Sequence, residues 1–161
     1  MCGGFVSKVI GHRLPSQIQQ VFDGEDLADK IGPAYLLMTT DDDGTPRPCM
    51  LSAGEIFVCD DRRIRIAVWP GSTSSKNLDR NQRVLLCFVA PGTVFYVKGR
   101  SRSLGKGAST QLQRFELNVD TVESDTHAGM PVGSPITFAL EDDGPAQVVA
   151  SWKRQIDDLK A

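Results

Sequence analysis

The sequence is most informative between residues 66 and 84, which read Ile66-Ala67-Val68-Trp69-Pro70-Gly71-Ser72-Thr73-Ser74-Ser75-Lys76-Asn77-Leu78-Asp79-Arg80-Asn81-Gln82-Arg83-Val84. An apolar strand runs into a Pro-Gly turn, and four hydroxyl residues precede a short helical segment that carries Lys76. The first backbone N–H groups of a helix have no partner within the helix, and the helix dipole is positive there, so an anion is favoured. Two interpretations stay open at this point: a phosphate cradle formed by residues 69–76, or an ordinary serine N-cap on a surface helix.

Length and composition indicate one soluble globular domain spanning residues 1–161, with 40% hydrophobic and 24% charged residues. The formal net charge of -2 argues against a nucleic-acid surface, which needs a basic excess. No apolar run is long enough for a membrane helix, and the N-terminus lacks a signal-peptide pattern. The four cysteines, Cys2, Cys49, Cys59 and Cys87, form no CxxC pair and are interpreted as reduced thiols rather than metal ligands. We therefore expect a cytoplasmic protein with no nucleic-acid or membrane partner.

Apolar periodicity predicts a helix at each end of the chain. The first begins at Ser16, with Ser16 and Gln19 as a capping-box pair, breaks at Asp23-Gly24 and stops at Gly32-Pro33. The last begins at Pro145, a residue that suits a first turn, and its apolar stripe consists of Val148, Val149, Trp152, Ile156 and Leu159.

Between these helices the pattern is that of β-strands in hairpin succession. Strands are expected at 34–40, at 46–58 with a bend at Gly54, and at 63–69, 83–90, 93–104, 112–122 and 136–140. Asp43-Gly44 is a specific hairpin signal, and the three carboxylates of residues 41–43 are interpreted as a solvated turn rather than a cation site. Short connections favour antiparallel neighbours, so the strands suggest a closed or half-closed barrel.

Three parts of the sequence, taken together, resemble the pyridoxamine 5′-phosphate oxidase-like family, the FMN-binding split barrels. They are the hairpin of residues 36–48, the segment from Trp69 to Val84 with its Gly-Ser and Asn-Leu pairs, and the apolar strand that follows. The resemblance implies a mainly β fold: a six-stranded antiparallel, Greek-key split β-barrel with flanking N- and C-terminal helices. It also implies a homodimer that holds FMN where the two subunits meet.

The resemblance further implies which residues hold the cofactor. Residues of the second strand would contact the flavin ring, namely Arg47, Cys49, Met50, Leu51 and Ser52. The end of the third strand and the turn after it would hold the phosphate, through Trp69, Ser72, Thr73, Ser74 and Lys76. Many family members have an Arg-Lys pair where this chain has Thr73-Ser74, and Lys76 is one turn further along. Charge-assisted hydrogen bonds are about twice as strong as neutral ones, so this difference predicts weaker FMN binding.

The implied function is a flavin-dependent oxidoreductase that passes hydride or electrons between a nicotinamide or similar donor and a small-molecule substrate. A long C-terminal substrate segment like that of the oxidase itself is not found, so oxidation of pyridoxamine phosphate is not the predicted reaction. Two alternatives stay open: a non-catalytic FMN or deazaflavin carrier or sensor, and a ligand-free barrel whose dimer face is its function. The cofactor supplies the redox chemistry, so no catalytic protein residue and no metal are assigned.

Two other features have competing interpretations. Lys98, Arg100 and Arg102 share one face of a strand and are either a solvated face or contacts for phosphates. His12 and His127 are interpreted as surface residues rather than as general bases.

Overall fold

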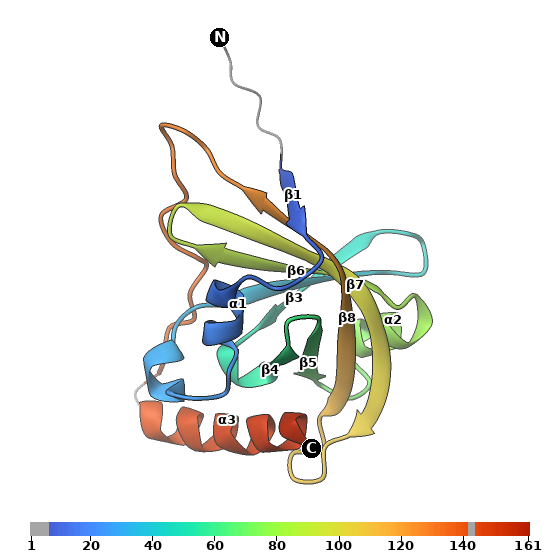
Figure 1. Cartoon of the computed structure of the whole chain (residues 1–161). Coiled ribbons are helices and arrows are strands. Elements are labelled where there is room, and N and C mark those ends of the chain that lie inside the picture. The colour runs from blue at the N-terminus through green and yellow to red at the C-terminus, as the bar shows by residue number, and fades with distance from the viewer. Residues whose placement is uncertain (1–6, 142–143) are drawn as a thin grey trace.

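A computed structural model of the chain describes residues 7–141 and 144–161 (Figure 1). The strands within these residues are β1 Lys8–Gly11, β2 Tyr35–Thr40, β3 Pro46–Leu51, β4 Ile56–Asp60, β5 Arg63–Val68, β6 Arg83–Ala90, β7 Thr93–Lys106 and β8 Gln113–Asp125. The helices are α1 Ser16–Val21, α2 Thr73–Arg80 and α3 Pro145–Lys160, with short 3-10 turns η1 Leu27–Lys30 and η2 Ala53–Glu55. None of the described helices has the length and apolar character needed to cross a membrane.

All strands belong to one antiparallel sheet with the order β3-β2-β6-β7-β8-β5-β4, and β1 pairs with the far end of β8. The two edge strands, β3 and β4, are separated in the chain only by residues 52–55. Because so short a connection must reach from one edge of the sheet to the other, the sheet curls until its edges approach each other. No pairing between β3 and β4 is found in the described residues, so the barrel remains open. This architecture confirms the predicted split barrel with flanking helices.

The barrel core is closed at one end by α3, which runs across it in Figure 1. Trp152, Ile156 and Leu159 of α3 are buried, as the apolar stripe predicts, and Val148 and Val149 pack against the same core. Trp152 lies so close to Gly54 that a Cβ at Gly54 would be 2.1 Å from the Trp152 Cγ. The predicted bend at Gly54 therefore has a packing cause: only glycine leaves room for the indole.

The predicted 46–58 strand is instead two strands separated by η2, and its direction changes there. Ser52 caps η2 through a capping box in which its backbone N–H and its hydroxyl donate to Glu55 Oε2 at 2.7 and 2.8 Å. This local hydrogen bonding competes with the strand ladder, because serine and glutamate satisfy backbone groups at a helix start. Lys8–Gly11 adds a strand where the sequence has no clear period, and the sheet contains eight strands.

Two other expectations were wrong. Residues 136–140 form no strand but make a single bridge, Pro33 to Thr137, as the 126–141 segment passes along the barrel. The Ser16–Gln19 capping box does not form: Pro15 occupies the N-cap position, and the Gln19 amide donates to the Leu14 carbonyl at 2.8 Å instead. The breaks at Asp23-Gly24 and Gly32-Pro33 are confirmed, because α1 and η1 are separate elements that end before Gly32. Cys2, named in the sequence analysis, lies outside the described residues.

Candidate functional site

The start of α2 has the geometry expected for an anion site. Ser72 is the N-cap, and its Oγ accepts a hydrogen bond from the Ser75 N–H at 3.1 Å. The Ser75 hydroxyl donates back to the Ser72 carbonyl at 3.2 Å. The Thr73 and Ser74 N–H groups make no hydrogen bond with any described residue, as is usual for the first positions of a helix. Two backbone donors therefore remain available beside the preceding Pro-Gly turn.

The space in front of this helix start is open. Gly71 has φ +75°, and a Cβ built on it would meet no atom within 4 Å. Trp69 precedes the turn and is 73% exposed, so its indole ring does not contribute to the core. Within the cradle of residues 69–76, Trp69, Gly71, Thr73 and Lys76 are exposed, whereas Ser74 and Ser75 are buried.

The body of α2 is fixed to the β2–β3 hairpin through a buried side chain. Asn77 is buried, and its amide donates to Thr39 Oγ1 at 3.1 Å and to Asp41 Oδ1 at 2.7 Å. Arg80 donates to the Asn77 side-chain oxygen at 3.1 Å and to the Thr40 carbonyl at 2.8 Å. Both the nitrogen and the oxygen of the Asn77 side-chain amide therefore have hydrogen-bond partners, and these bonds set the position of α2 relative to the sheet.

The β2–β3 hairpin also places charged side chains beside Thr73 and Lys76 of the cradle. Thr73, Lys76 and the aspartates of residues 41–43 line a small cavity of about 310 Å³. Arg47 pairs with Asp41 at 2.7 Å, and Arg80 pairs with Asp42. The hydrogen bonds from Arg47 and Asn77 lower the pKa of Asp41, and the carboxylate in turn raises the pKa of Arg47. Lys76 makes no ion pair with any residue of the described chain, so its ammonium group is available at the cradle.

The five predicted ring contacts on and after β3 do not share one environment. Arg47 and Cys49 lie on the side of β3 that faces α2, and the Cys49 thiol, whose pKa is raised by burial, interacts with the Ser74 side chain. Met50 lies on the opposite, outer face and is 53% exposed. Leu51 and Ser52 are buried. Alternation along the strand explains why Met50 faces away from Arg47 and Cys49.

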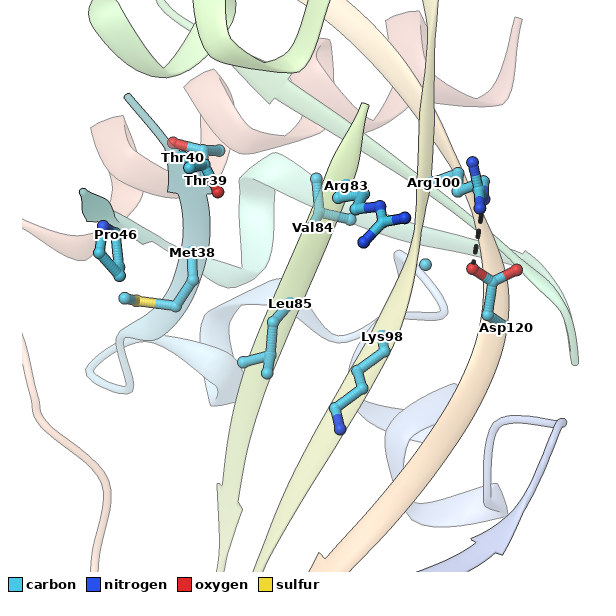
Figure 2. A pocket seen from close by; sticks show the side chains of 11 residues that line it. Met38, Thr39, Thr40, Pro46, Arg83, Val84, Leu85, Lys98, Arg100 and Asp120 are labelled. Atoms are coloured by element: carbon cyan, nitrogen blue, oxygen red, sulfur yellow. Dashed lines mark ion pairs between the residues drawn. The ribbon is translucent and has the colours of Figure 1, made fainter. Parts of the chain in front are cut away.

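A groove of about 390 Å³ crosses the outer face of the sheet from β2 to β8 (Figure 2). Met38, Pro46 and Leu85 form its apolar part, and Arg83, Lys98 and Arg100 form its cationic part. Lys98 pairs with Glu123, Arg100 with Asp120 at 3.7 Å, and Arg102, beyond the groove, with Glu116 at 2.8 Å. These cross-strand pairs support the interpretation of the Lys98/Arg100/Arg102 face as a charge-balanced strand surface.

Glu55 and Glu116 have shifted pKa values and lie outside the cradle. Burial raises the pKa of Glu55, which caps η2. Glu116 on β8 is 3% exposed and accepts hydrogen bonds from Arg102 and from Arg65, the latter at 3.3 Å; the bond from Arg102 is the main cause of its lowered pKa. Arg65 also donates to the Leu159 carbonyl at 2.8 Å, so Glu116 links the barrel to the end of α3.

The structure therefore gathers six of the ten sequence-predicted residues around the start of α2, namely Arg47, Cys49, Ser72, Thr73, Ser74 and Lys76. Trp69 precedes the Pro-Gly turn and is exposed, whereas Met50 lies on the outer face of β3 and Leu51 and Ser52 are buried. Sequence reasoning did not assign Asp41 and Asn77 to the site, although they hold Arg47 and α2 in place. The three adjacent aspartates gave no indication of these contacts, because Asn77 and Arg80, which bind Asp41 and Asp42, lie far along the chain.

Comparison with known proteins identifies relatives of both the sequence and the fold. No family model matches the sequence. The chain is 30% identical over 149 residues to the uncharacterized protein YclD of Bacillus subtilis (strain 168), covering 91% of this chain and 96% of YclD.

Among solved structures, HupZ of Group A Streptococcus matches with a TM-score of 0.56 at 12% identity, covering 74% of this chain and 99% of HupZ. A Lactobacillus delbrueckii protein described as a candidate pyridoxamine 5′-phosphate oxidase matches with a TM-score of 0.56 at 18% identity, covering 73% of this chain and 98% of that one. At these identities the likeness concerns the fold. The chain therefore belongs to one family with Bacillus subtilis YclD, and its fold is that of the pyridoxamine 5′-phosphate oxidase-like split barrels.

Proposed function

We propose that the chain binds FMN and that the cradle holds the FMN phosphate. The observation that carries this proposal is the start of α2, where the Thr73 and Ser74 N–H groups have no protein partner and open space lies beside Gly71. A helix start with such donors is suited to a phosphate. The ammonium group of Lys76 adds a positive charge one turn later, and the hydroxyl of Thr73 is exposed beside it.

The charge balance around the cradle is compatible with a dianionic ligand. Asp41 would repel a phosphate, but Arg47 and Asn77 already bind its carboxylate, and Arg80 balances Asp42. The remaining repulsion, together with hydroxyls in place of an Arg-Lys pair, leads us to expect weaker FMN binding than in family members with that pair.

We further propose that the protein is an oxidoreductase acting on a small molecule with a nicotinamide or similar electron donor. When bound, the flavin supplies the hydride or electron transfer. The residues of the chain would bind the phosphate, orient the cofactor along β3 and limit access of water. Cys49 is a neutral thiol in this setting, because burial raises its pKa.

We also propose that the active form is a homodimer joined through the outer face of β3, β2 and β6. The register places Met50 beside Leu36 and Leu36 beside Cys87, and likewise Pro48 beside Met38 and Met38 beside Leu85. These neighbours form a continuous, partly exposed apolar surface next to the groove of Figure 2. A contiguous apolar surface of this kind is typical of a protein interface.

The experiment that tests the cofactor is the visible absorption spectrum of freshly purified protein, followed by mass identification of any released chromophore. Titration of the stripped protein with FMN and with riboflavin separates phosphate binding from ring binding. Replacing Ser72, Ser74 and Lys76 together by Ala is expected to weaken FMN far more than riboflavin. Equal loss for both ligands would assign these residues to folding or to ring contacts instead.

A second measurement separates an enzyme from a carrier. Bleaching of bound flavin by NADPH or NADH, with turnover in the presence of an acceptor, supports the oxidoreductase. Tight flavin binding with no oxidation of any donor supports the non-catalytic module. Failure to bind FMN or riboflavin would contradict the proposal that the chain binds FMN.

A further inference from the structure

The groove on the outer face of the sheet contains a cation that no carboxylate of the described chain binds. Its volume of about 390 Å³ is within the range of small-molecule sites. Of its three cationic side chains, Lys98 pairs with Glu123. Arg100 pairs with Asp120 at 3.7 Å. The Arg83 guanidinium makes no hydrogen bond or ion pair with any residue of the described chain.

Arg83 lies beside a second arginine on the next strand. The register of β6 and β7 places Arg83 directly opposite Arg100. Side chains at such positions share one face, with Cβ atoms about 4.5–5.5 Å apart, and like charges there are destabilising. In Figure 2 the Arg83 guanidinium points from β6 toward β7, whereas Arg100 turns toward Asp120. The described chain thus holds two guanidinium groups on adjacent strands and supplies a carboxylate to one of them.

The carboxylates that pair in the groove lie on the strand farther from Arg83. Asp120 and Glu123 belong to β8, and β7 separates β8 from β6. Neighbouring strands are about 4.8 Å apart, so the backbones of β6 and β8 are about 10 Å apart. Asp120 is an extra residue of β8 at a β-bulge, since the register with β7 passes from Thr121 to Val119, and a bulge re-aims a side chain. Three positive and two negative side chains therefore leave one positive charge, at Arg83.

The wall of the groove next to Arg83 is apolar. Leu85 is two residues further along β6 and so on the same face of the sheet, and Met38 of β2 is its cross-strand neighbour. Pro46 at the start of β3 continues this wall, which lies to one side of Arg83 in Figure 2. A molecule in the groove would therefore place its apolar body on these side chains and a charged end at Arg83.

We propose that the groove binds a small organic monocarboxylate with an apolar body, and that Arg83 binds its carboxylate. The guanidinium fork matches the two oxygens of a carboxylate. One negative charge balances the single unmatched positive charge and reduces the repulsion between Arg83 and Arg100, whereas a dianionic phosphate leaves a negative excess. The site requires no cofactor. It borders the proposed dimer surface, with which it shares Met38 and Leu85.

The test uses hexanoate as the probe and hexanamide as an uncharged control of the same shape. Calorimetric titration of the full chain is done at low ionic strength, because salt screens exposed charges. We expect hexanoate to bind about tenfold or more tightly than hexanamide, the effect of a hydrogen-bonded charge pair. Acetate, which lacks the apolar body, and hexyl phosphate, which carries more than one charge near neutral pH, should both bind more weakly. Any of these three ligands binding as tightly as hexanoate would overturn the proposal.

Substitution of Arg83 tests the assigned residue. Arg83→Gln should weaken hexanoate about tenfold or more and leave hexanamide unchanged. Lys106→Gln is the matched control, because Lys106 is an exposed cation of β7 that does not line the groove, and it should bind hexanoate as the natural chain does. Leu85→Ala should weaken hexanoate severalfold and leave acetate unchanged, since only the apolar contact is lost. Unchanged hexanoate affinity in Arg83→Gln, or equal losses in Arg83→Gln and Lys106→Gln, would contradict the proposal.

Two further measurements exclude other causes of a lost signal. Arg83 is exposed, and removing its charge relieves the repulsion with Arg100, so the melting temperature of Arg83→Gln should not fall. The other source of a carboxylate is a second copy of the chain. A natural dimer that binds no hexanoate, and that becomes monomeric in Arg83→Gln by light scattering, would assign Arg83 to the subunit interface and overturn the proposal. FMN affinity in the same samples reports separately on the cradle.

Discussion

The Asn77 side-chain amide donates a 2.7 Å hydrogen bond to Asp41 Oδ1, although the two residues are 36 positions apart in the chain. Asp41 accepts a second bond from Arg47, also at 2.7 Å. One carboxylate thereby joins α2 to both strands of the β2–β3 hairpin. The orientation of the α2 start, and with it the proposed phosphate site, depends on this connection.

Replacing Asn77 by Ala is expected to lower the free energy of unfolding by about 1–3 kcal/mol, because Asp41 and Thr39 lose a buried donor. FMN affinity should fall severalfold, since α2 is no longer fixed. Chemical denaturation and FMN titration measure the two effects. Asp79→Ala is the matched control, because Asp79 is exposed on the same helix. Loss of similar size in both variants would contradict the role given to Asn77.

Two substitutions at Ser72 distinguish its role in capping α2 from its proposed role in binding the phosphate. Ser72→Ala should reduce stability by about 1 kcal/mol, since the bond to the Ser75 N–H is lost, whereas Ser72→Asp should keep it, because aspartate caps as well as serine. The added carboxylate in Ser72→Asp should weaken FMN by about tenfold or more through charge repulsion and leave riboflavin unaffected. Unchanged FMN affinity in Ser72→Asp would place the phosphate elsewhere.

Met50→Asp tests the proposed dimer face. A carboxylate at the centre of an apolar interface is unfavourable, so the variant should be monomeric when the natural chain is dimeric by light scattering. Met130→Asp is the control, because Met130 is 69% exposed on a different part of the chain. A natural chain that is itself monomeric, or a dimer that survives Met50→Asp, would remove this face from consideration.

The lowered pKa of Glu116 predicts that the free energy of unfolding depends on pH. Its pKa in the folded chain is lowered by Arg102 and Arg65, so the stabilisation is present above the ordinary glutamate pKa of about 4.3 and is lost as pH falls through the lower folded value. Glu116→Gln should reduce stability near neutral pH by about 1–3 kcal/mol and flatten the acid part of the curve. Denaturation measured from pH 7 to pH 3 compares the two proteins. If the free energy of unfolding fell with pH equally in the natural chain and in Glu116→Gln, a group other than Glu116 would cause the loss of stability in acid.

Gly54→Ala tests the packing of α3 on the barrel. The new methyl group would meet the Trp152 ring, and overpacking of this kind lowers stability by about 1–3 kcal/mol. Gly133→Ala is the control, because a Cβ there has no neighbour within 4 Å. Thermal unfolding of both variants provides the comparison, and equal melting temperatures would rule out the clash.

Local sequence signals were sufficient for the elements that local chemistry controls. Asp43-Gly44 forms the hairpin, Ser72 caps α2, and the stripe from Val148 to Leu159 faces the core. Turn residues, N-caps and a 3.6-residue period act over a few residues, so they can be recognised in the sequence without the fold.

Tertiary structure decided what depends on partners far along the chain. Strand partners are chosen by non-local hydrogen bonds, so the pairing of β1 with β8 and the single bridge that residues 136–140 make with Pro33 have no local signal. The same reason applies to Asp41, which resembles a solvated turn residue in the sequence because Asn77, one of the residues that bind it, is 36 positions away. The sequence by itself determined the barrel and the start of α2, and only folding determined which side chains surround that start, because their contacts link separate segments.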